Sequence, residues 1–354
     1  MIEPVQQWFR RRFSDPQVVI LTAFLIGFFA VIVLFGGWIG PVLAAVVFAY
    51  LLDYPVEIGM RVGMPRWLAV SLVFVVFIAL LAAVLFGLLP ILSHQVSQFF
   101  TSIPMMVDEG QKLLMTLPAQ YPELISVEQI DELSTAIRRS MTQFGQNALS
   151  QTLSWIPGLV TLLIYLILVP LLVLFMLKDK QELLRWFKGL LPREYGLSLK
   201  VWNNVDDQIA NYVRGKFWEI LIVGVATWVG FAIFGLEYAV LLAALVGVSV
   251  LVPYIGATVV TIPVAIVAFF QFGWTTEFAW VMGIYAVIQA LDGNVLVPLL
   301  FSEVVNLHPI AIIVAVLFFG GLWGFWGVFF AIPLATLVKA VMDAWPREAR
   351  TVQT

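Results

Sequence analysis

The stretch YAVLLAALVGVSVLVPYIGATVVTIPVAIVAFFQFGWTT, residues 238–276, contains no Asp, Glu, Lys or Arg. A helix crosses the hydrocarbon core of a bilayer with about 20 apolar residues, so this run is nearly twice the length of one span. Over such a length in lipid, only helices satisfy their own backbone groups. Because Pro253, Gly256 and Pro263 interrupt it, the run predicts either one broken span or a re-entrant hairpin.

Uncharged runs of the same kind recur along the chain. They lie at residues 18–52, 67–93, 149–177, 220–236 and 304–338. Hydrophobic residues make up 62% of the sequence and charged residues 12%, whereas soluble domains have about 25% charged residues. The sequence therefore predicts an all-α, polytopic integral membrane protein with about six to eight transmembrane helices. The segment 304–338 carries Pro309, Pro333 and several glycines, and it too predicts a broken or re-entrant segment.

Proline, glycine and charge divide the chain into six expected units. These are N-terminal membrane helices at 1–91, an outward-facing helical insertion at 92–152, a membrane helix at 153–177, a basic cytoplasmic amphipathic segment at 178–216, a C-terminal membrane region at 217–342 and a cytoplasmic tail at 343–354. Within the first and fifth units, we expect helices at 16–35, 41–56, 66–91 and 217–235, with a tight turn at 36–41. The insertion carries an apolar stripe at 130–148, which predicts either packing on its own subunit or an oligomer contact.

The distribution of basic residues predicts the orientation in the membrane. The segment 178–216 has eight Lys and Arg, whereas 92–150 has three. Because cytoplasmic loops are enriched in Lys and Arg, we expect 178–216 inside and 92–150 outside. The basic residues near both ends of the chain place the N- and C-termini in the cytoplasm.

Several classes of chemistry are poorly supported. The chain has no cysteine and only two histidines, His94 and His308, so a metal site is not expected, nor is thiolate catalysis. The sequence contains no Walker A loop, which argues against ATP as the energy source. We therefore expect no enzyme activity, no cofactor and no nucleic-acid partner. Two classes stay open, a secondary transporter and a non-transporting scaffold.

Asp292 is the leading candidate for a transport residue. It follows Glu277 by 15 positions, or about 22 Å of helix, so it lies well inside a predicted span. An ionisable group at such depth suggests cation binding or proton transfer. The alternative is structural, since Asp292-Gly293 is also a turn signal.

Five other polar residues join the candidate site. They are Asn294, Gln289, Tyr254, Arg214 and His308. The first three lie near the predicted breaks and could line a path for a hydrophilic solute, or hydrogen-bond between helices. Arg214 could pair with Asp206 or Asp207, bind an anionic substrate, or remain at the interface. His308 could sense protons or simply begin a helix.

A group of motifs in the C-terminal half is similar to a known family. The motifs are Asn211-Tyr212-Val213-Arg214-Gly215-Lys216, Val252-Pro253-Tyr254-Ile255-Gly256-Ala257, Gln289-Ala290-Leu291-Asp292-Gly293-Asn294, His308-Pro309 and Ile332-Pro333-Leu334. They resemble the AI-2E family of bacterial permeases, and residues 10–16 and 301–309 resemble its PerM branch. The resemblance implies an inner-membrane homo-oligomer that exports a small solute such as autoinducer-2, or exchanges Na⁺ for H⁺.

Overall fold

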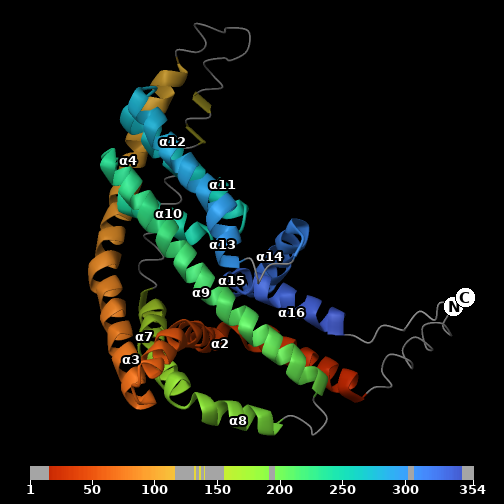
Figure 1. The fold of residues 1–354 in the computed structure, drawn as a ribbon. Helices are drawn as coiled ribbons and strands as arrows, with labels where there is room; N and C mark the ends of the chain where they lie inside the picture. Colours follow the sequence, from red (N-terminus) through yellow and green to blue (C-terminus); the bar gives the residue numbers. More distant parts are fainter. Residues whose placement is uncertain are drawn as a thin grey trace, which may run out of the picture.

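The computed structural model describes residues 16–115, 155–190, 196–301 and 307–344, and residues 131, 132, 135, 136 and 139. The described residues form helices and turns, and these ranges contain no strand. Six of the helices are long and apolar enough to cross a membrane. The predicted class, an all-α polytopic membrane protein, is therefore confirmed (Figure 1).

The helices follow one another in a simple order, in which η marks a π-helical turn. They are α2 Pro16–Arg61, α3 Arg66–Ala83, η1 Val84–Leu88, α4 Leu89–Leu114, α7 Trp155–Lys178, α8 Lys180–Leu190, α9 Gly196–Ile233, α10 Ala239–Ser249, α11 Ile255–Phe272, α12 Thr276–Leu291, η2 Asp292–Leu296, α13 Val297–Phe301, α14 Pro309–Trp323, α15 Phe325–Phe329 and α16 Ala331–Ala344.

The N-terminal helix α2 is continuous, so the tight turn predicted at 36–41 is wrong. The glycine and proline there serve helix packing instead. A Cβ atom on Gly40 would collide with the Tyr165 hydroxyl of α7, so glycine allows close approach of the two helices. Pro41 is accommodated inside the helix.

The expected boundary between the span 66–91 and the insertion 92–152 is not a break. Helix α3 continues through η1 into α4 as far as Leu114. The side chains of α4 then contact the turn between α9 and α10. Gln95 Oε1 accepts a hydrogen bond from the Leu241 amide at 2.8 Å, and Phe99 packs edge-on against Tyr238. Most of the apolar stripe at 130–148 lies outside the described residues.

The helix expected at 217–235 begins much earlier, because α9 starts at Gly196. The basic segment 178–216 is thus shared between the amphipathic helix α8 and the first half of α9. Charged residues continue inside α9 as far as Glu219. The sequence prediction starts this helix after Lys216, whereas in the structure Lys216 lies inside the helix and pairs with Glu219.

Both predicted interruptions are present. Helices α10 and α11 are separated at residues 250–254, where Tyr254 has a φ of 63°. Helices α14 and α15 are separated at Gly324, with a φ of 58°. At about 22 Å, the fifteen residues of α14 are short for a span, and α14 packs against both α15 and α16. Leu251 from the first interruption and Trp323, the residue before Gly324, pack in one hydrophobic cluster.

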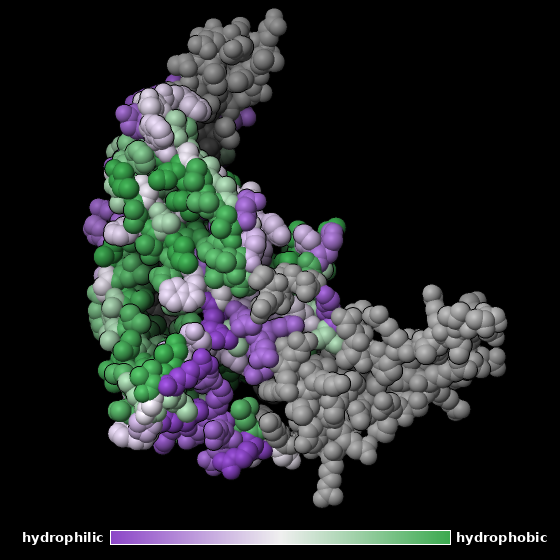
Figure 2. All heavy atoms as spheres, viewed as in Figure 1, coloured by the Kyte–Doolittle hydropathy of each residue, from purple (hydrophilic) through white to green (hydrophobic). Residues whose placement is uncertain are grey.

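Polar contacts join helices at each end of the molecule. Lys180 lies 2.5 Å from Asp53, which links α8 to the C-terminal part of α2. At the other end of the molecule, Gln271 donates to the Gly235 carbonyl at 2.8 Å. Figure 1 shows α8 and the start of α12 at opposite ends, and Figure 2 shows hydrophobic residues covering much of the visible surface between these ends.

Candidate functional site

An ion pair is buried in the middle of α9. Lys216 Nζ lies 2.7 Å from Glu219 Oε2, and the two side chains are 5% and 2% exposed. Their spacing of three residues places them on one face of the helix. A charge inside a membrane span is costly unless it is paired, so this pair marks the interior of α9 as specialised.

Lys216 also reaches the first interruption. Its Nζ donates a hydrogen bond to the Val250 carbonyl at 2.7 Å, and it lies 5.2 Å from the centre of the Phe301 ring. Val250 is the C-cap residue of α10, where helix carbonyls lack a partner within the helix. The ammonium therefore satisfies the end of a broken helix and faces the negative end of its dipole.

Asp292 approaches the same place from another helix. It begins the π-helical turn η2, which contacts α9, and it lies within electrostatic range of Lys216 and Glu219. Asp292 has helical backbone angles and lies in the π-helical turn 292–296, so the chain does not turn at Asp292-Gly293 as the alternative predicted. Among the described residues, its buried Oδ1 atom has no hydrogen-bond partner.

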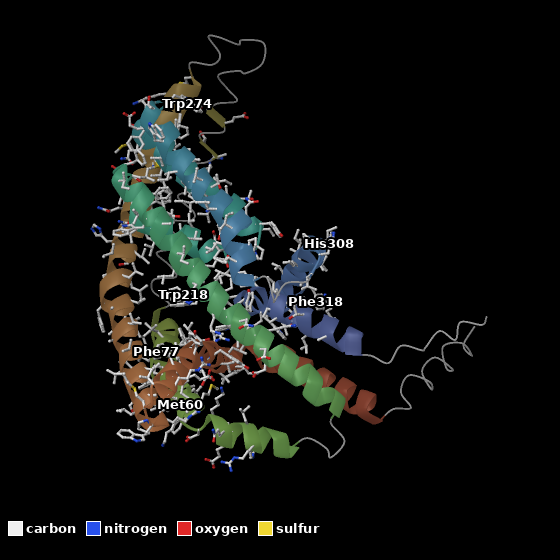
Figure 3. All side chains as sticks on the ribbon, viewed as in Figure 1. Met60, Phe77, Trp218, Trp274, His308 and Phe318 are labelled. Atoms are coloured by element: carbon white, nitrogen blue, oxygen red, sulfur yellow. The ribbon has the colours of Figure 1, made fainter. Side chains whose placement is uncertain are left out.

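Helix lengths place these charges at a similar depth. Lys216 lies about 25 Å from the end of α9 at Ile233, and Asp292 lies about 24 Å from the start of α12 at Thr276. Those two helix ends are on the same side, because Gln271 at the end of α11 bonds to Gly235. Trp218, labelled in Figure 3, marks the level of the ion pair on α9.

Two further contacts surround the N-terminal half of α9. The Tyr50 hydroxyl donates a hydrogen bond to Asp206, linking α2 to α9. Arg214 bonds to the Ala210 carbonyl and to Asn211, both at 3.0 Å, and lies over the Tyr54 ring. Neither Asp206 nor Asp207 is its partner in these bonds, so the predicted acidic partner of Arg214 is replaced by an amide and a ring.

The remaining predicted residues separate into two groups. Gln289 precedes Asp292 by one helical turn, and its buried Nε2 has no hydrogen-bond partner within the described ranges. Tyr254 forms the interruption itself, with an exposed side chain.

By contrast, exposed Asn294 bonds to the Ala290 carbonyl of its own helix. His308 caps α14 by accepting from the Ile310 amide, at the point labelled in Figure 3. The structure therefore brings neither Asn294 nor His308 into contact with the charged cluster.

The sequence interpretation missed Lys216 and Glu219, the two most buried charges of the site. Lys216 ends the basic segment predicted at 178–216, and Glu219 lies near the start of the helix predicted at 217–235, so neither belongs to the predicted site. Their spacing of three positions with opposite charge is the typical signal of an intrahelical pair. That signal was present in the sequence.

The sequence pattern of the AI-2E transporter family matches residues 2–347. The chain belongs to this family. It is 50% identical to PerM of Escherichia coli K12, a protein named as a permease, over 98% of both chains. It is 30% identical to YueF of Bacillus subtilis, named as a transport protein, over 82% of this chain and 80% of that one. Membership supports a role in transport rather than catalysis for this multi-pass membrane protein.

Proposed function

We propose that the protein is a secondary transporter, not driven by ATP, that moves a small hydrophilic solute across the bacterial inner membrane. The observation that carries this proposal is the charged cluster of Lys216, Glu219 and Asp292 beside the α10–α11 interruption. Charges and non-helical backbone survive at membrane depth only within protein or beside water. Broken helices at such positions are where transporters bind substrates and ions.

The class of solute is inferred from the polar atoms of the site that have no hydrogen-bond partner. The carboxylate oxygen Asp292 Oδ1 and the amide nitrogen Gln289 Nε2 have no hydrogen-bond partners among the residues described. One accepts and the other donates, so together they suit a hydroxyl-rich solute. The family resemblance makes an autoinducer-2-like molecule the first solute to test.

Proton coupling is the second candidate, as in a cation/proton antiporter. Two carboxyl groups, Glu219 and Asp292, lie within electrostatic range of each other and inside the predicted spans. Such paired acids are the usual carriers of protons through membrane proteins.

The basic-residue bias supports cytoplasmic termini. The contact of Lys180 in α8 with Asp53 in α2 supports the placement of these two parts of the chain on the same side of the membrane. The predicted homo-oligomer stays a prediction.

Purified protein in liposomes tests the proposal. Saturable flux of one member of a solute panel is expected from the wild type, with loss of flux in Asp292→Asn. Asn294→Ala is the matched control, because this neighbouring side chain bonds only within its own helix. Cation-driven proton movement without solute flux would favour the antiporter. Absence of any saturable flux would indicate the scaffold and refute transport.

A further inference from the structure

We propose that the Lys216 ammonium is a tethered cation that occupies a monovalent-cation site, whose oxygen ligands are Glu219 and the Val250 carbonyl and whose negative charge is increased by the nearby Asp292. A free Na⁺ ion would bind there only when the lysine is removed. The proposal assigns a ligand class, monovalent cations, to this site. Its consequence for transport rests on the proposed function.

The first argument concerns the oxygen atoms around the ammonium. Val250 O and Glu219 Oε2 both lie 2.7 Å from Lys216 Nζ. One is a backbone carbonyl at the end of an interrupted helix, and the other is a carboxylate. Carbonyls and half-helix C-terminal ends are the groups with which broken membrane helices coordinate Na⁺. The lysine nitrogen therefore lies where such an ion would lie.

The second argument concerns what the ammonium leaves unsatisfied. Glu219 Oε2 lies 2.7 Å from Lys216 Nζ and has no other partner in the described part of the chain. Asp292 Oδ1 is likewise unpartnered there. An ammonium has three donors in fixed directions, whereas a metal ion attracts oxygens from all directions. Glu219 and the Val250 carbonyl thus offer oxygen ligands to a free cation, and Asp292 adds negative charge nearby.

The consequence for transport is specific. A lysine fixed in the site supplies the positive charge that other transporters take from solution, so wild-type flux should not depend on a Na⁺ gradient through this site. The covalent attachment also keeps the charge from leaving with the solute. Among the two coupling ions considered, the arrangement therefore favours H⁺ over Na⁺.

Cation binding to purified protein tests the inference without any transport measurement. The melting temperature in detergent is measured as NaCl replaces choline chloride at constant ionic strength. Lys216→Ala should show a saturable rise of at least about 3 °C, and the wild type should show none. Lys180→Ala is the matched control, because it removes a lysine from the half-exposed ion pair with Asp53. The double variant Lys216→Ala/Glu219→Gln should lose the response.

Each other outcome is decisive. A folded Lys216→Ala protein that ignores Na⁺ would overturn the inference, as would a wild-type response that Glu219→Gln abolishes. If the alanine variant does not fold, Lys216→Ser is tested by the same titration. Its short, neutral side chain leaves the Val250 carbonyl free for Na⁺, and its failure to respond counts equally against the site. Wild-type protein without solute flux would refute the proposed function while leaving this binding result unchanged.

Discussion

The burial of the Lys216–Glu219 pair leads to a quantitative prediction for Lys216→Met. Methionine has a similar length and can pack against the Phe301 ring, but it leaves the Glu219 carboxylate, 2% exposed, without its cation. Removing one partner of a buried ion pair costs about 3–5 kcal/mol. Lys180→Met, which breaks a pair whose lysine is 40% exposed, should cost at most about 1 kcal/mol.

The double variant Lys216→Met/Glu219→Leu gives the sharper comparison. Replacing both members of a buried pair by apolar residues is often neutral or stabilising. We therefore expect the double variant to be more stable than Lys216→Met alone, although it carries one more substitution. The measurement is the free energy of unfolding in detergent and choline chloride, which excludes rescue by Na⁺.

The reasoning would be refuted by either of two results. One is a Lys216→Met cost no larger than that of Lys180→Met, which would mean that water already solvates the pair. The other is additivity, in which the double variant loses the sum of the two single losses. Residues in direct contact should instead show a coupling energy of about 0.5–3 kcal/mol.

Three further predictions follow from the geometry. Gly215→Ala should destabilise the protein by about 1–3 kcal/mol in the same unfolding assay, because the new Cβ would lie 2.6 Å from the Phe301 ring. The control Gly283→Ala, where the new Cβ would meet open space, should not destabilise it in this way. In liposomes, Asp292→Asn should remove flux or its pH dependence while the protein stays folded, and near-normal, pH-dependent flux would remove Asp292 from the site. A reporter active only in the cytoplasm should be silent when fused near residue 120 and active near residue 195, and activity at residue 120 would reverse the orientation.

The sequence was sufficient to predict the helical class and the two interruptions, because both depend on local chemistry. Pro253 has no N–H to donate to a helix, and in the structure Gly256 lies so close to the Ser249 carbonyl that a side chain would collide with it. The combination of proline and glycine in one short stretch therefore pointed to a break. The same kind of signal failed at Gly36–Pro41, where the helix continues. Glycine serves both turns and close helix packing, and the sequence alone does not separate the two uses.

The candidate site was predicted in part for a similar reason. Asp292 stood out because it is an isolated charge far from the ends of its span. The π-helical turn that it begins has no comparable local signature, and Asp-Gly suggested a turn instead. The contact of Tyr50 with Asp206 joins residues 156 positions apart, and only the folded chain shows it. Lys216 and Glu219 were within reach of sequence reasoning, since their spacing suits an intrahelical pair.

The interruption and the buried lysine are best understood as one feature. In a continuous helix, the Val250 carbonyl would accept a hydrogen bond from the amide four residues later, at Tyr254. Residues 250–254 leave the helical path before that amide, and Lys216 donates to the carbonyl in its place. Without the lysine, the end of α10 would leave a carbonyl unsatisfied inside the membrane, and without the break, the ammonium would lose an oxygen partner. The buried ammonium and the unpaired carbonyl are thus each stabilised by the other. A motion that separates α9 from the end of α10 must therefore expose both of them to a replacement ligand. Water, a cation or a polar solute can supply that ligand, and lipid cannot.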